Sequence, residues 1–253
     1  MLNQKLALIT GVSSGIGYCI MNALLNENCR VIGIVRSDER KEELEQKLTT
    51  ELTTEQLAAL TLKVCDLSRP SAIEALAAQL KSEKLSPDIL INNAGIGCYG
   101  PHEELDAHAL AKMTAVNFTA PLLLTNLLLR DLKANKGHIL FVSSITAGKT
   151  NNTHGCAYGA TKAGITSFAK SLFEEVRKYD VRVTVLAPDL TRTALYRDAS
   201  FCAAEEDDAA LSPEEVAEYA LFALNARNGL NLTEITMQPQ HHRLSKKAVT
   251  KNP

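Results

Sequence analysis

The stretch Thr10-Gly11-Val12-Ser13-Ser14-Gly15-Ile16-Gly17 follows directly on the apolar run Leu6–Thr10 and leads into a segment with helical periodicity. Its three glycines are spaced G-x-x-x-G-x-G, and glycine lets a backbone come close to a ligand. The free N–H groups and the dipole at the start of a helix favour an anion. The strand–turn–helix setting therefore predicts a phosphate-binding loop, with a glycine-rich turn that serves only tight packing as the alternative.

Short apolar runs alternate with helix-like stretches along almost the whole chain. Continuous apolar runs are typical of strands covered on both faces, and their alternation with helices predicts βαβ crossovers. We expect strands at Leu6–Thr10, Arg30–Val35, Leu60–Cys65, Ile89–Ile91, His138–Val142, Val181–Leu186 and Leu232–Met237. The predicted fold class is α/β, a doubly wound, mostly parallel seven-stranded sheet with helices on both faces.

The chain is expected to form one domain. No linker rich in Pro, Gly or Ser and no shift in composition divides the 253 residues, so we expect a single domain over 1–253. A helix is expected over Ser71–Leu85, with Ser68 or Ser71 as its N-cap. The basic segment 241–253 has few apolar residues, and we expect it to be loosely held.

Composition and charge exclude several classes of protein. With 45% hydrophobic and 22% charged residues, the chain is not intrinsically disordered over most of its length. The 27 basic and 29 acidic side chains leave no footprint for nucleic acid or an anionic membrane. No apolar run reaches the roughly 18–20 residues of a membrane helix, and the six cysteines lack zinc-ligand spacing, so no metal is expected. Scattered thiols and no signal-peptide pattern favour the cytosol.

Tyr158 and Lys162 are four residues apart, so on a helix they lie on one face. A tyrosine of ordinary pKa, about 10, transfers protons poorly near neutrality. A nearby ammonium group is expected to lower that pKa into a useful range. Ser144, at the end of a predicted strand, could present its hydroxyl to the same site. The spacing Tyr-x-x-x-Lys also occurs by chance on exposed helices.

Five separated motifs, taken together, resemble the short-chain dehydrogenase/reductase family over about residues 5–195. They are the glycine pattern of 10–17, Asn92-Asn93-Ala94-Gly95, Asn117, Ser144 and Tyr158-x-x-x-Lys162. The resemblance implies a Rossmann-like fold and a hydride transfer between a nicotinamide and a carbonyl or alcohol substrate. It also implies a homodimer or homotetramer.

The resemblance also implies catalytic roles for four residues. Tyr158 would be the general acid or base, and Lys162 would lower its pKa and hold the nicotinamide ribose. Ser144, preferred over its neighbour Ser143, would hydrogen-bond the substrate oxygen, and Asn117 would support a water relay to the lysine. For Asn117, a local bond to the backbone is the alternative.

The end of the second predicted strand indicates which cofactor binds. A carboxylate there would bind the adenosine ribose hydroxyls, but this chain has Val35 followed by Arg36, which can pair with a phosphate. We therefore expect NADP(H) rather than NAD(H), with an exposed arginine close to Asp38 as the alternative. The cofactor-binding residues implied by the resemblance are Gly11, Ser13, Ser14, Gly15, Ile16, Gly17, Arg36, Ser37, Asp66, Leu67, Asn92, Ala94, Gly95, Tyr158, Lys162, Pro188, Thr191 and Thr193.

The sequence departs from the family pattern at Asp189, where glycine is usual. Aspartate tolerates left-handed backbone, so we expect the turn to survive. The segment of about 195–211 lies where family members carry a mobile substrate lid, and its acidic run Glu205–Asp208 is expected to be solvated rather than to bind a cation. Cys98 and Tyr99 are expected near the substrate pocket, but no motif specifies the substrate.

Two alternative functions stay open. One is a non-catalytic NADP(H)-binding sensor of the same fold. The other is a serine hydrolase, because Gly11–Gly15 also spells G-x-S-x-G with Ser13 as the nucleophile. That alternative needs an acid and a histidine later in the chain, and His241 and His242 are poorly placed for the role.

Overall fold

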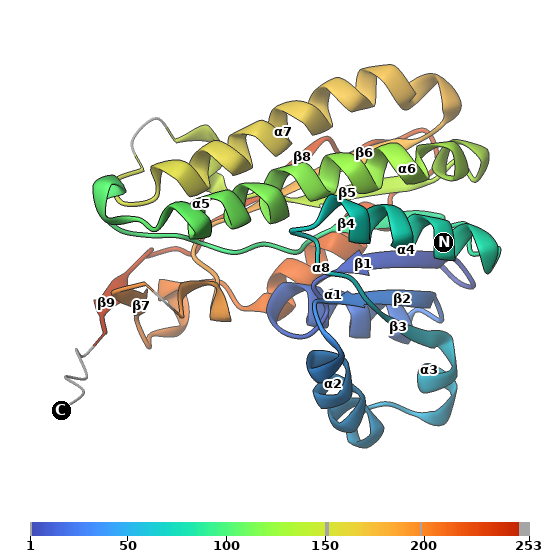
Figure 1. The fold of residues 1–253 in the computed structure, drawn as a ribbon, viewed down its shortest axis with the longest axis horizontal. Helices are drawn as coiled ribbons and strands as arrows, with labels where there is room; N and C mark the ends of the chain where they lie inside the picture. The colour runs from blue at the N-terminus through green and yellow to red at the C-terminus, as the bar shows by residue number, and fades with distance from the viewer. Residues whose placement is uncertain (1, 150–151, 198, 248–253) are drawn as a thin grey trace.

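The structure, a computed structural model, describes residues 2–149, 152–197 and 199–247. A parallel seven-stranded sheet in the order β3-β2-β1-β4-β5-β6-β8 runs through its centre (Figure 1). The strands are β1 (Leu6–Thr10), β2 (Arg30–Val35), β3 (Leu60–Val64), β4 (Ile89–Asn92), β5 (His138–Val142), β6 (Arg182–Pro188) and β8 (Glu234–Met237). The predicted doubly wound α/β sheet is confirmed, since all seven expected runs form its strands.

Helices cover both faces of this sheet (Figure 1). They are α1 (Gly15–Asn26), α2 (Asp38–Glu51), α3 (Thr54–Ala59), α4 (Pro70–Ser82), α5 (Ala107–Thr114), α6 (Ala120–Ala134), α7 (Cys156–Val176) and α8 (Pro213–Leu224). α1 and α8 pack on one face, and α4, α6 and α7 pack on the other. In the described part of the chain, no helix is long and apolar enough to cross a membrane.

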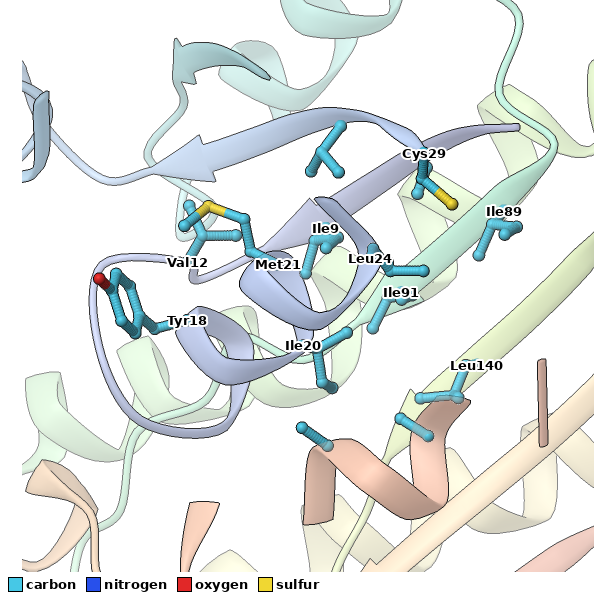
Figure 2. Close-up of a cluster of buried hydrophobic side chains, with 14 of the residues drawn as sticks. Ile9, Val12, Tyr18, Ile20, Met21, Leu24, Cys29, Ile89, Ile91 and Leu140 are labelled. Atoms are coloured by element: carbon cyan, nitrogen blue, oxygen red, sulfur yellow. The ribbon is translucent and has the colours of Figure 1, made fainter. Parts of the chain in front are cut away.

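Alternate side chains of the five inner strands, β2, β1, β4, β5 and β6, enter two separate cores, as the period-2 geometry of a strand predicts. Ile9 of β1 and Ile91 of β4 lie in the core beneath α1, together with Ile20 and Leu24 of that helix (Figure 2). Leu8 enters the core on the opposite face. Burying each of these side chains contributes roughly 1.5–3 kcal/mol. This packing holds the start of α1 beside the carboxyl end of β1, where the glycine loop lies.

One local prediction was wrong, and a short strand forms where none was expected. α4 begins at Pro70, with Arg69 as N-cap, because proline supplies the helical φ of a first position. Neither Ser68 nor Ser71 caps it, and the Ser68 hydroxyl donates instead to Oδ1 of Asp66 over 2.7 Å. Leu244–Lys246, within the segment expected to be loosely held, forms strand β9.

β9 pairs in antiparallel fashion with β7 (Phe201–Ala203), inside the expected lid (Figure 1). A strand ladder joins backbone groups, so the pairing does not require the apolar side chains that this segment lacks. The Lys247 ammonium group also donates to the carbonyl oxygen of Arg197 over 2.7 Å. Residues 248–253 of the expected tail lie outside the described residues.

A buried histidine makes the stability of the fold depend on pH. His138 of β5 is 2% exposed, its Nε2 lies 2.8 Å from the Thr184 hydroxyl, and burial lowers its pKa from 6.5 to about 3. Below pH 6.5 the unfolded chain binds a proton at this histidine and the folded chain does not, so stability falls as the pH drops from 6.5 towards 3.

His138→Gln should therefore flatten the fall in melting temperature between pH 6.5 and 4. Thermal unfolding of both proteins over this range tests the prediction, with the two curves compared as differences from pH 7. Parallel curves would contradict it.

Candidate active site

A cavity opens at the carboxyl edge of the sheet beside β1 and β4, the adjacent strands from which the chain continues towards opposite edges of the sheet. Open α/β sheets bind ligands at such a switch point. The cavity has a volume of about 770 Å³. Arg36, Arg40 and Asp66 line one end, and Ser144 and Tyr158 line the other. The cavity therefore extends from the predicted phosphate loop to the predicted catalytic residues.

The glycine loop leaves the start of α1 open to an anion. Gly11 and Gly15 have φ values of +73° and +59°, which favour glycine. A Cβ at Gly17 would lie 2.3 Å from the Gly11 carbonyl oxygen, so this glycine is required by packing and does not line the cavity. Within the described chain, no side chain caps α1 at Ser14 and no acidic residue lies in its first turn. Its first N–H groups therefore remain available to a phosphate.

The loops after β1 and β4 are joined by Asn93. Its Nδ2 donates to the carbonyl oxygens of Thr10 over 2.9 Å and Gly11 over 3.1 Å. The Thr10 hydroxyl in turn accepts from the backbone N–H groups of Asn93 and Ala94, each over 3.0 Å. Sequence reasoning chose the neighbouring Asn92, which the structure places outside the cavity wall, 4% exposed. Asn93 thus shapes the floor of the phosphate loop.

Two guanidinium groups face the end of the cavity where β2 stops. Arg36 is exposed, and among the described residues no carboxylate pairs with it. Arg40, which sequence reasoning missed, lies in the first turn of α2 and forms an ion pair with Glu43. Ser37, predicted to bind the cofactor, is not on the wall and instead accepts from the Arg40 N–H as the N-cap of α2.

Asp66 and Leu67 lie on the same wall, as expected. The Asp66 Oδ1 accepts from the backbone N–H of Ser68 over 3.0 Å. Burial opposes ionisation of this carboxyl, but its hydrogen bonds from Ser68 prevail and lower its pKa. A carboxylate is therefore held at the edge of the cavity, where it can accept a hydrogen bond.

Ser144, Tyr158 and Lys162 converge at the other end. Tyr158 and Lys162 lie on α7, and Lys162 donates from Nζ to the Val142 carbonyl oxygen over 2.8 Å. Ser144 lies close enough to the Tyr158 hydroxyl to lower its pKa. Ser143 is directed elsewhere, since its hydroxyl donates to the Lys162 carbonyl oxygen over 3.1 Å. The second serine of the pair is therefore the one beside the phenol.

The expected acidification of Tyr158 by Lys162 is not found. Burial raises the pKa of Tyr158 above its ordinary value, and hydrogen bonds from Ser144 and Tyr99 oppose this rise only in part. Burial also lowers the pKa of Lys162 to about 8. The lysine loses its charge before the phenol ionises, so no ammonium is present to stabilise the phenolate.

Asn117 stands behind the wall, in a π-helical turn over Ala115–Thr119 between α5 and α6. Its amide accepts from the Ile96 N–H over 2.9 Å and donates to the Ile96 carbonyl oxygen over 2.8 Å. It also donates to the Thr161 hydroxyl of α7 over 3.3 Å. Asn117 thereby ties the loop after β4 to α7, and its part in a water relay stays a prediction.

Pro188, Thr191 and Thr193 line the cavity after β6, as expected. Asp189 does not adopt the left-handed backbone that was expected of it. Its Oδ1 accepts from the Leu190 N–H over 2.8 Å and lies 3.1 Å from Nδ1 of His242. The turn is held by the carboxylate itself, which also contacts the C-terminal segment.

The remaining cofactor-site predictions, Ser13, Ser14, Ile16, Ala94 and Gly95, all line the cavity. A Cβ at Gly95 would lie in ordinary contact with the Lys162 Nζ, at 3.5 Å, so the backbone of Gly95 passes directly beside the lysine. The open helix terminus, the glycines and the buried lysine together fit a dinucleotide stretched from Arg36 to Tyr158. The described residues hold no cluster of side chains that could bind a metal ion.

Comparisons with known proteins agree with this geometry. A family model described as short chain dehydrogenase matches residues 5–200. An NADP-dependent 3-hydroxy acid dehydrogenase of Escherichia coli is 29% identical over 243 residues, which cover 92% of this chain and 94% of that protein.

Two solved structures have the same fold. A metagenomic short-chain oxidoreductase in complex with NADP is 29% identical, with a TM-score of 0.78 over 94% of this chain and 98% of that one. A 3-ketoacyl-(acyl-carrier-protein) reductase of Brucella melitensis, complexed with NADH, is 25% identical, with a TM-score of 0.80 over 96% of this chain and 100% of that one. The chain belongs to the short-chain dehydrogenase/reductase family of oxidoreductases.

Proposed function

We propose that this oxidoreductase uses NADP(H) to interconvert a carbonyl and an alcohol, with Tyr158 as the proton-transfer group. The observation that carries the proposal is the meeting of Ser144, Tyr158 and Lys162 at one end of a cavity that begins at an open helix terminus. The nicotinamide, when bound, supplies or accepts the hydride at the substrate carbon.

The protein's own groups act on the substrate oxygen. In the reductive direction, the neutral Tyr158 phenol donates its proton to the oxygen as negative charge develops there. The Ser144 hydroxyl donates a hydrogen bond to the same oxygen and stabilises that charge. Lys162 uses one of its N–H donors on Val142 and keeps others for ribose hydroxyls. The raised pKa of Tyr158 keeps the phenol protonated at neutral pH, and a developing alkoxide still takes this proton because an alkoxide is a stronger base than a phenolate.

NADP(H) is the proposed cofactor because Arg36 and Arg40 flank a strand end that has Val35 in place of a carboxylate. Guanidinium groups bind phosphate oxygens through paired hydrogen bonds. The relatives support NADP(H) in part, since one neighbour holds NADP and another holds NADH. Cytosolic location and assembly into a homodimer or homotetramer stay predictions.

The two alternatives are less well supported. A serine hydrolase would need a histidine beside Ser13, but in the described chain no histidine lines the cavity that contains this serine. A non-catalytic sensor would not require Ser144 to contact the Tyr158 hydroxyl. Turnover separates an enzyme from a sensor directly.

Tyr158→Phe should lower the rate of carbonyl reduction by about 10²- to 10⁴-fold, because the proton donor is lost. The dissociation constant for NADPH should change less than about threefold, because the aromatic ring remains. NADPH oxidation followed at 340 nm with a panel of aldehydes and ketones measures the first effect, and calorimetric titration measures the second. Full activity in the variant would contradict the assignment of Tyr158, and a wild type that binds NADPH without any turnover would favour the sensor.

Arg36→Ala should weaken NADPH binding about tenfold, which is the loss expected for one charged contact to a phosphate. NADH has no 2′-phosphate, so its dissociation constant should stay within about twofold. Arg130→Ala, an exposed arginine of α6, is the matched control and should change neither constant. Equal weakening of both cofactors by Arg36→Ala would show that this arginine does not recognise the phosphate.

A further inference from the structure

Four aromatic rings gather at the substrate end of the cavity and form what we call the aromatic cluster: Tyr99, Tyr158, Tyr196 and Phe201. The Tyr99 ring is at its centre, with centroid distances of 5.5 Å to Tyr158, 5.6 Å to Tyr196 and 5.4 Å to Phe201. Tyr196 and Phe201 are themselves 5.5 Å apart. The cluster therefore joins the loop after β4, helix α7 and the expected lid.

Tyr99 holds the position from which a substrate would have to react. Its ring centroid lies 5.5 Å from that of Tyr158, and Tyr99 and Ser144 are both close enough to the Tyr158 hydroxyl to lower its pKa. A substrate oxygen must reach the hydroxyls of Ser144 and Tyr158 for the proposed proton transfer. In this conformation, Tyr99 presents an aromatic ring with an oxygen attached at the site where such an oxygen would bind.

The chain leaves room for this inward position of Tyr99. A Cβ at Gly97 would lie 2.4 Å from Cε2 of the Tyr99 ring and 3.2 Å from its hydroxyl oxygen. Gly97 is not among the glycines with positive φ, so its backbone does not require glycine. The missing side chain at Gly97 instead opens a slot that a planar ring fills.

We propose that Tyr99 is a gate that imitates the substrate, and that the slot accepts an aryl ketone, aryl aldehyde or benzylic alcohol whose ring replaces that of Tyr99. The proposal rests on the proposed function and names its substrate class. When Tyr99 swings out, Tyr196 and Phe201 still face the vacated slot. An aromatic ring there gains about three- to tenfold in affinity over a saturated ring of similar size, because aromatic rings at these spacings attract one another.

The test is a binding titration on the cofactor-free protein with a matched pair of probes, 1-phenylethanol and 1-cyclohexylethanol. The phenyl alcohol should bind the wild type about three- to tenfold more tightly. Tyr99→Ala should tighten its binding a further tenfold or so, because the ring no longer competes with the gate. Tyr219→Ala, which removes a tyrosine 47% exposed on α8, should leave both affinities unchanged.

A double variant tests where the probe binds. Adding Gly97→Ala to Tyr99→Ala places a methyl group in the slot and should abolish the gain for 1-phenylethanol. Tyr99→Phe keeps the ring in place and should give no gain. Equal affinities for the two alcohols, no measurable binding of either, or a gain that survives Gly97→Ala would each overturn the proposal.

Turnover provides a second measurement that separates this proposal from the proposed function. With NADPH, KM for acetophenone should be about three- to tenfold lower than KM for cyclohexyl methyl ketone in both proteins, and Tyr99→Ala should lower KM for acetophenone further. If the wild type reduces aliphatic ketones but neither the wild type nor Tyr99→Ala prefers aryl ketones, the proposal for Tyr99 is wrong and the proposed function is unaffected. If no carbonyl is reduced, the proposed function fails, and the titrations still decide whether Tyr99 blocks an aryl site.

Discussion

The hydrogen bond from the buried Lys162 ammonium group to the Val142 carbonyl oxygen is the contact on which the active site depends. It fastens α7 to the end of β5, and this places Tyr158, one turn earlier on the helix, beside Ser144. A buried charge is costly, and here the cost is visible as a lysine pKa lowered to about 8. Asn117 supports the arrangement from behind by tying α7 to the loop after β4.

This contact changes the chemistry that the Tyr–Lys spacing suggested. The spacing correctly placed both side chains on one helical face, but the effect of an ammonium group on a phenol depends on which group loses its proton first. Because burial moves the two pKa values in opposite directions, Tyr158 stays a neutral phenol over the range in which Lys162 is charged. A neutral phenol held by two hydroxyls is suited to donate a proton to a substrate oxygen.

Sequence pattern predicted the seven strands because most of them are continuous apolar runs. It also predicted most of the cavity wall, because the glycine loop and the loops after β4 and β6 follow strands that end at one edge of the sheet. The prediction of site residues failed where the direction of a side chain determines whether it faces the cavity. Asn93 rather than Asn92 faces the cavity, and Arg40 reaches it only because α2 turns that way. The pairing of β7 with β9 depends on backbone groups 43 residues apart, from Cys202 to Ser245, and side-chain pattern carries no signal for it.

The account depends most on the protonation state of one phenol. ¹³C NMR of tyrosines labelled at Cζ, with Tyr158→Phe to identify the resonance, measures that state directly during a pH titration of the free protein. We predict that the Tyr158 signal keeps the shift of a neutral phenol up to at least pH 10.0, the ordinary tyrosine pKa. A titration centred below that value would show that Lys162 acidifies the phenol after all, and would contradict the account.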